Sequence, residues 1–163
     1  MTAIETVSLR KAGPEDEPLL YDLFAEDRAA QFAACGMGEA QFKPLIEMQY
    51  RGRKMTYAAQ YPAAEDSILL DEDGQPVGRL LLDRRPDRWR IVDIAVLVNH
   101  RGRGLGTQVL KECQRQCETA EVRMELQVAL WNPARRLYER LGFRAIREDA
   151  VAVEMVWSAA DEM

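Results

Sequence analysis

In some segments of the chain apolar residues recur every three or four positions, which predicts helices. In others they recur every two positions, which predicts strands. In residues 14–28 apolar side chains recur at helical spacing behind Pro14, a residue that suits the first turn of a helix. Residues 42–61 are predicted as a second helix. Residues 133–141 form another, for which Asn132 is a favourable N-terminal cap.

Short runs with period two, or continuous apolar runs, predict strands between these helices. The predicted strands are residues 7–9, 67–71, 77–83, 91–98, 124–130 and 151–157. Asp73-Gly74 is a strong hairpin-turn signal between the second and the third strand. Residues 91–98 are apolar except for Asp93, as expected of a central strand covered on both faces. Early hairpins followed by strands that alternate with helices predict a mixed α/β sheet.

Composition and charge narrow the class of protein. The 163 residues, 47% of them hydrophobic and 30% charged, suit one globular domain that spans residues 1–163. The chain starts without a basic region before an apolar run, and no uncharged apolar stretch reaches the roughly 20 residues of a membrane span. We therefore expect a cytoplasmic protein with no membrane partner. The net charge of −5 lacks the basic footprint of nucleic-acid binding, so no nucleic-acid partner is expected.

The three cysteines do not indicate a disulfide framework or a metal site. Cys113 and Cys117 are four residues apart on a predicted helix and face one way, but the chain has one histidine, His100, and no second pair of ligands. Packing is the favoured interpretation of both thiols. We expect no bound metal.

A helix is predicted to begin inside "VNHRGRGLGTQVLKECQ", residues 98–114. Around its start stand three glycines and two arginines: Gly102, Gly104, Gly106, Arg101 and Arg103. The first amides of a helix lack internal acceptors and carry a partial positive charge, and glycines let a ligand approach them. The pattern indicates a pyrophosphate cradle. An ordinary glycine-rich turn with solvated arginines is the alternative.

Two well-known phosphate loops fit this turn poorly. A Walker loop needs Gly-Lys-Ser/Thr, whereas Gly106 is followed by Thr107-Gln108. A dinucleotide fingerprint begun at Gly102 needs glycine or alanine where Thr107 stands. Neither ATP nor NAD is indicated.

Two segments resemble motifs of the GCN5-related N-acetyltransferase (GNAT) family. "IAVLVNHRGRGLGTQVL" looks like its acyl-coenzyme A signature Arg/Gln-x-x-Gly-x-Gly/Ala, matched by Arg101, Gly104 and Gly106. "NPARRLYERLGF", residues 132–143, is similar to a second family segment that follows in the same order. The resemblance implies the acyl-CoA N-acyltransferase fold, with about seven strands, four main helices and a sheet that splays open beside the fourth strand.

The resemblance also implies acetyl-CoA as co-substrate and assigns residues to it. The pantetheine arm would pair with the backbone of Val96 and Val98, and Asn132 would contact it. The pyrophosphate would rest on the amides of Arg103, Gly104, Leu105, Gly106 and Thr107.

The implied reaction is direct attack of a neutral primary amine on the thioester in a ternary complex. Tyr138 matches the family tyrosine that protonates the leaving thiolate, although its spacing also fits a core aromatic on a short helix. An amide near Val96 would polarise the carbonyl. Gln127 stands where some relatives carry a basic glutamate, so the general base is unassigned among Asp93, Glu125, Glu154 and water. A cysteine nucleophile is disfavoured because His100 has no partner histidine.

The acceptor is predicted to bind beside the first two helices and the last hairpin. The segment "EMQYRGRKMTYAAQYP" offers an amphiphilic surface of Met48, Gln49, Arg53, Tyr57 and Tyr61. Its arginines suit a carboxylate-bearing small molecule, and a solvated helix is the equal alternative. A small-molecule amine is the first hypothesis for the acceptor. A protein or peptide N-terminal acetyltransferase and a non-catalytic acyl-CoA-binding module are the alternatives. The family resemblance is compatible with a homodimer.

Overall fold

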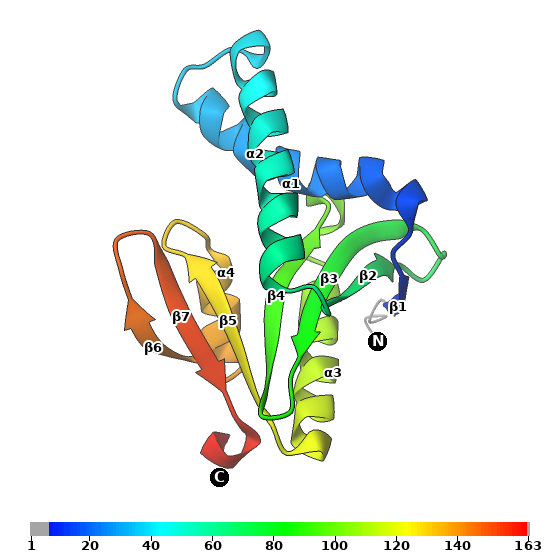
Figure 1. Cartoon of the computed structure of the whole chain (residues 1–163), viewed down its shortest axis with the longest axis vertical. Coiled ribbons are helices and arrows are strands. Elements are labelled where there is room, and N and C mark those ends of the chain that lie inside the picture. The colour runs from blue at the N-terminus through cyan, green and yellow to red at the C-terminus, as the bar shows by residue number, and fades with distance from the viewer. Residues whose placement is uncertain (1–6, 163) are drawn as a thin grey trace.

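A computed structural model describes residues 7–162 of the chain. Within that range seven strands form one sheet in the order β1-β2-β3-β4-β5-β7-β6 (Figure 1). The strands are β1 (Ser8–Lys11), β2 (Glu65–Leu70), β3 (Pro76–Arg84), β4 (Arg88–Val96), β5 (Arg123–Ala129), β6 (Arg144–Glu148) and β7 (Ala152–Trp157). The α-helices are α1 (Glu17–Ala34), α2 (Glu39–Gln60), α3 (Leu105–Ala120) and α4 (Ala134–Arg140). Short 3-10 helices cover Pro14–Asp16, Val98–His100 and Ala159–Glu162. The predicted mixed α/β sheet is confirmed.

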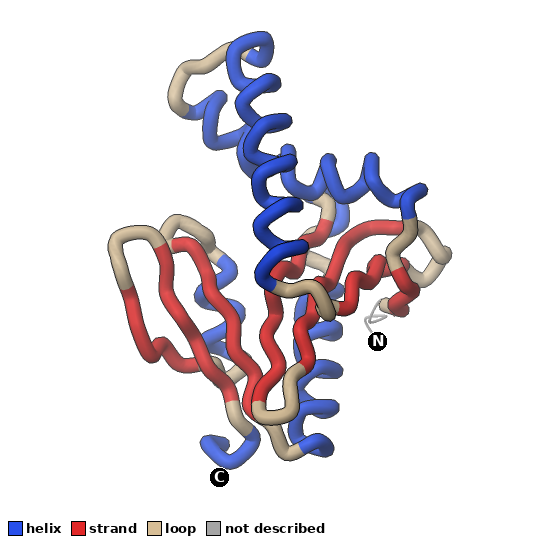
Figure 2. Tube along the Cα trace, viewed as in Figure 1, coloured by secondary structure: helices blue, strands red, loops and turns tan. Residues whose placement is uncertain are grey.

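The sheet consists of two antiparallel parts joined by a parallel pair of strands. Strands β1 to β4 pair antiparallel in chain order, and β5, β7 and β6 form the second part. Strands β4 and β5 run parallel, so the chain crosses over between them through α3 (Figure 2). This junction is where the sheet opens.

The opening begins at a bulge in β4. Along the described chain the pairing of β4 with β5 ends at Ile91 opposite Leu126. Consecutive residues of β3 pair with Ile91 and Asp93 and skip Val92, so Val92 is the extra residue of a β-bulge. A bulge bends its strand and increases the local twist. Beyond it β4 and β5 separate, as Figure 1 shows at the upper end of the sheet.

The bulge also changes which face Asp93 occupies. Strict alternation would place Asp93 with Ile91, which packs in the core on the α3 side. Instead Asp93 contacts Arg53 of α2, and its neighbour Ala95 packs in the cluster formed by α1 and α2. The bulge therefore directs a carboxylate away from the larger core.

Apolar side chains fill the space on both faces of the sheet. One cluster joins the sheet to α3 and α4, and the other joins it to α1 and α2. Cys113 and Cys117 lie buried in the first cluster, where burial raises the pKa of Cys113 to about 11 and that of Cys117 to about 12. Both thiols thus stay protonated and act as packing groups. No helix of the described chain is long and apolar enough to cross a membrane.

Three of the differences between the observed elements and the sequence predictions have a clear physical reason or a large extent. Strand β6 was missing from the hydrophobic pattern because all five of its residues are exposed. Helix α1 extends to Ala34, six residues beyond the predicted end. The predicted strand over residues 91–98 ends at Val96, because residues 98–100 turn into a 3-10 helix in which His100 N–H donates to Leu97 O at 2.9 Å.

Candidate active site

A cleft of about 540 Å³ lies between the separated end of β4, the glycine-rich turn, the start of α3 and helix α4. Most of the predicted site residues line it: Val96, Arg101, Gly104, Leu105, Gly106, Thr107, Asn132 and Tyr138. Two predicted residues, Val98 and Arg103, are not among its lining residues. The topology thus brings together two motifs about 30 residues apart in sequence.

The start of α3 presents free amides to this cleft. Gly104 takes a left-handed conformation with φ 80° before the helix, and its carbonyl accepts the Gln108 N–H at 2.9 Å. The amides of residues 105–107 therefore precede the first intrahelical bond and have no acceptor within the helix. A Cβ added at Gly106 would meet no heavy atom within 4 Å, and its φ is not positive. Protein packing does not require this glycine, and the space beside it is open.

The exposed backbone of β4 is limited to its last residues. Leu97 N–H donates to Val77 O of β3 at 2.9 Å, so alternation turns the N–H and C=O of Val96 toward the gap beside β5. The Val96 carbonyl accepts a bond from Arg101 Nε at 2.9 Å, and Arg101 Nη2 lies 3.1 Å from Asp27 Oδ1. Arg101 thereby fastens the turn to the end of the strand.

Val98 requires a correction. The family resemblance implied an exposed strand edge there, but Val98 lies in the 3-10 helix after β4. Its N–H donates to Glu26 Oε2 at 2.9 Å, and its side chain is half exposed. The strand edge that faces the gap ends at Val96.

Tyr138 stands on α4, on the cleft wall opposite β4. Its side chain is 7% exposed and meets the ring of Phe143 edge-on, with centroids 5.9 Å apart. Burial, and to a lesser extent the Asp93 charge, raise the pKa of Tyr138 to about 12. The phenol is therefore a protonated group at neutral pH, suited to give a proton. Helix α4 begins at Ala134, one residue later than predicted, and Asn132 Oδ1 accepts the Ala134 N–H at 2.9 Å, the bond expected of a capping side chain.

The carboxylates considered as a base are ion-paired. Asp93 Oδ2 lies 3.6 Å from Arg53 Nη2 and 3.5 Å from Arg79 Nη1. Glu125 and Glu154 both contact Arg90, with Glu125 Oε1 3.3 Å from Arg90 Nη1. These carboxylates are held in charge networks on the sheet. Because ion-paired carboxylates are poor bases, water is the favoured acceptor of the proton that the amine loses.

Two smaller cavities continue from the cleft toward α1 and α2. The first, of about 150 Å³, shares Asp27, Ile94, Ala95, Trp131 and Asn132 with the cleft. The second, of about 420 Å³, shares Leu20, Arg53 and Arg79 with the first. An acceptor on this side would approach the cleft past Trp131 and Asn132.

Sequence reasoning missed several residues of these cavities. Trp131 lines both the cleft and the first cavity although its side chain is 59% exposed. Arg28 and Arg79 reach the first cavity from α1 and β3. The position of Trp131, directly before the Asn132 motif, was a usable signal. The two arginines had none, because their meeting depends on how α1 packs on the sheet.

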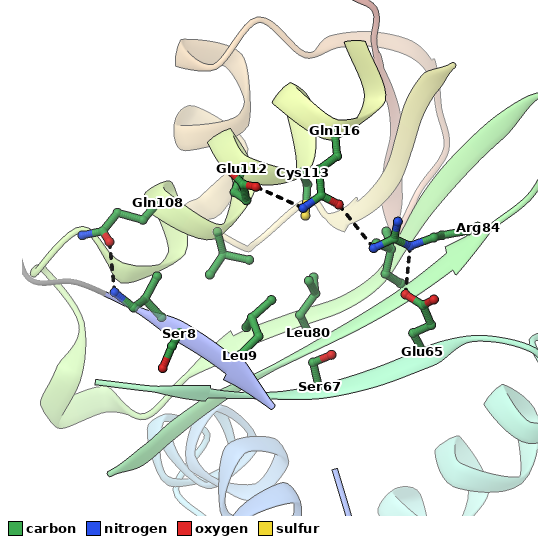
Figure 3. A pocket seen from close by; sticks show the side chains of 13 residues that line it. Ser8, Leu9, Glu65, Ser67, Leu80, Arg84, Gln108, Glu112, Cys113 and Gln116 are labelled. Carbon is green, nitrogen blue, oxygen red and sulfur yellow. Dashed lines mark hydrogen bonds and ion pairs between the residues drawn. The ribbon is translucent and has the colours of Figure 1, made fainter. Parts of the chain in front are cut away.

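A further cavity, of about 440 Å³, lies away from this site between β1–β3 and α3. Glu65, Arg84 and Gln116 form a hydrogen-bonded chain along one side of it (Figure 3). Its walls contain no predicted site residue and no glycine.

A match to a family model defines the class of the protein as an acetyltransferase. Residues 19–143 match the model of the acetyltransferase (GNAT) family, and the chain belongs to that family. No curated protein sequence matches the chain significantly.

Solved structures of acetyltransferases share the fold. PaiA N-acetyltransferase from Thermoplasma acidophilum, in complex with coenzyme A, is 16% identical with a TM-score of 0.71, covering 94% of this chain and 99% of that one. An acetyltransferase from Thermus thermophilus is 23% identical with a TM-score of 0.66, covering 94% and 97%. Apo FdhC, a nucleotide-linked sugar GNAT, is 15% identical with a TM-score of 0.68, covering 95% and 88%. The coenzyme A complex of the first agrees with the expected acetyl-CoA co-substrate.

Proposed function

We propose that the protein transfers an acetyl group from acetyl-CoA to the primary amine of a small molecule, by direct attack in a ternary complex. The observation that carries this proposal is that one cleft is lined by all the groups the reaction needs. Its walls combine the free amides at the start of α3, the exposed edge of β4 at Val96 and the protonated phenol of Tyr138.

The cleft residues fit an acyl-CoA. The amides of residues 105–107 and the helix dipole suit a pyrophosphate, and Gly106 leaves room for it. His100 lines the same cleft, and its buried Nδ1 has no hydrogen-bond partner among the described residues. Val96 would bond the pantetheine arm as an added strand does, once Arg101 releases its carbonyl.

Acetyl-CoA supplies the thioester that the amine attacks. The Val96 N–H faces the gap and would donate to the carbonyl oxygen as negative charge develops there. Tyr138 would donate its proton to the sulfur as the C–S bond breaks and the C–N bond forms. Water would accept the proton that the amine loses, and solvent would return a proton to Tyr138.

A small acceptor is favoured by the size of the cavities on the acceptor side. The cavities between the sheet and α1–α2 have volumes of about 150 and 420 Å³. A protein or peptide acceptor needs an extended groove through which the chain can enter and leave. A peptide acceptor is therefore the alternative hypothesis, and the experiment below includes peptides.

The testing experiment measures free CoA released from acetyl-CoA over a panel of small amines and short peptides. The proposal predicts acceptor-dependent release with small amines and little with peptides. Release with peptides alone would replace the small-molecule assignment. CoA binding without release for any acceptor would identify a non-catalytic acyl-CoA-binding module.

A further inference from the structure

Two arginines on different helices line the first acceptor cavity, and both lie over the ring of Phe24. The Cζ atoms of Arg28 on α1 and Arg53 on α2 lie 3.8 and 4.6 Å from the centroid of the Phe24 ring. Burial and the neighbouring Arg53 charge lower the pKa of Arg28. Like charges held together away from water are costly unless an anion joins them.

The neighbouring carboxylates are largely committed to other cations. Asp66 binds Arg79 through two bonds, of 2.8 and 2.9 Å. Asp93 is shared between Arg79 and Arg53. Asp27, which also lines the cavity, pairs with Arg101.

Arg28 and Arg53 retain donors that these contacts do not satisfy. The Arg28 Nε donates to the neutral side chain of Gln49 at 2.9 Å. The Arg53 Nε is buried without a hydrogen-bond partner among the described residues. In and beside the cavity four guanidiniums, of Arg28, Arg53, Arg79 and Arg101, stand against three carboxylates, of Asp27, Asp66 and Asp93. One positive charge is therefore left to be matched by a ligand.

The position of the pair defines what this ligand is. Both arginines line the cavity of about 150 Å³ that shares Trp131 and Asn132 with the cleft. A group bound there belongs to a molecule whose other end reaches the reacting atoms. A planar carboxylate accepts parallel N–H bonds from a guanidinium, and its single charge matches the excess. A dianionic phosphate would be repelled by Asp93, which lies 3.6 Å from Arg53 Nη2.

We propose that the acceptor is a compact amine that carries a carboxylate, an amino acid or a close analogue, and that Arg28 and Arg53 bind this carboxylate. The proposal rests on the proposed function, because it names the substrate of the same site. Arg28 and Arg53 are specificity residues, which select the acceptor and leave acetyl-CoA binding unchanged.

The test compares α-amino acids with the amines that lack the carboxylate and with amino-acid amides, by release of CoA. Arg28→Gln and Arg53→Gln should each lower kcat/KM for amino acids roughly 10- to 100-fold, the effect of losing a charge-assisted hydrogen bond, mainly through KM. For amines without a carboxylate, kcat/KM of the same variants should fall less than about threefold, because these amines make no charge-assisted hydrogen bond with the arginines. Arg51→Gln, on an exposed part of α2, is the matched control and should leave both classes unchanged.

The outcomes separate this inference from the proposed function. Wild-type preference for amines without a carboxylate, polyamines included, overturns the inference and leaves acetyl transfer intact. An equal loss for both acceptor classes in the Arg28→Gln variant also overturns it, because the arginine then serves structure. Should the Arg53→Gln variant unfold because it loses the Asp93 contact, the result with Arg28→Gln decides. No release with any amine contradicts the proposed function itself.

Discussion

Ile91 of β4 pairs with Leu126 of β5, and beyond this pair the two strands of the described sheet separate. The separation follows from the bulge at Val92, which bends β4, while β5 continues to Ala129 in regular pairing with β7. Backbone that would have completed the sheet is left facing a cleft. A ligand that offers an extended, hydrogen-bonding chain can fill this gap.

Substitution of Gly106 tests whether the start of α3 is a binding surface. Gly106→Glu should weaken CoA binding at least about 100-fold in titration calorimetry, because it places bulk and negative charge on the amides. Folding should be unchanged or stabilised by up to about 1 kcal/mol, since glycine is a poor helix residue. Gly52→Glu is the matched control: Gly52 lies within α2, and an added Cβ there also meets no atom within 4 Å. Equal CoA affinity of both variants would reject the site.

Two substitutions of Asn132 separate its cap from its contact with the co-substrate. Asn132→Ala should lower the free energy of unfolding by about 0.5–2 kcal/mol, because the Ala134 N–H loses its acceptor. Asn132→Asp keeps that acceptor and should unfold like the wild type. Both variants should raise KM for acetyl-CoA, since both lose the amide donor. A normal KM for Asn132→Asp would limit Asn132 to its structural role.

Removal of the Tyr138 hydroxyl tests its role as the acid. Tyr138→Phe should lower kcat roughly 100-fold, the usual contribution of a positioned acid, with little change in KM for acetyl-CoA. Because the pKa of Tyr138 is raised to about 12, its loss of a proton should not reduce the wild-type rate between pH 7 and 10. Tyr21→Phe is the control, since Tyr21 packs against Tyr50 outside the cleft. Unchanged turnover in Tyr138→Phe would assign the proton to another group.

Asp16 should make the stability of the fold depend on acid pH. Its carboxylate binds Arg10 at 2.8 and 2.9 Å and accepts the Gly13 N–H at 2.8 Å, which lowers its pKa from 3.8 to about 2. The stabilisation is complete above pH 4 and is lost as pH falls through about 2. Asp16→Asn should cost about 1–3 kcal/mol at pH 7, and the difference from wild type should shrink below pH 4. Denaturant unfolding at several pH values measures the free energy of unfolding of both proteins, and the substitution Glu15→Gln at an exposed position is the control. A pH-independent difference would contradict the assignment.

Much of the fold follows from the hydrophobic pattern. The four helices and six of the strands lie where apolar spacing, the Asp73-Gly74 turn and the Asn132 cap predict them. Strand β6 does not, because it is an edge strand with exposed side chains and its pairing with β7 supplies the structure. The bulge at Val92 also escapes prediction, since an extra residue in a β-branched apolar run has no local signature.

The candidate site also has residues that the sequence predicts and residues that it does not. Residues in the glycine-rich turn and around Tyr138 were predictable because each group stands within a short motif. The approach of Arg28 and Arg53 to the same cavity, and the pairing of Asp93, depend on how α1 and α2 cross the sheet. Such contacts between distant segments arise from tertiary packing, which local patterns do not encode.

A crystal structure of the protein with acetyl-CoA tests the central claim most directly. The account predicts the diphosphate within hydrogen-bonding distance of the amides of residues 105–107, the pantetheine arm along β4 at Val96, and the thioester sulfur beside Tyr138. Acetyl-CoA bound elsewhere, for instance in the cavity between β1–β3 and α3, with the cleft filled by protein side chains, would contradict it.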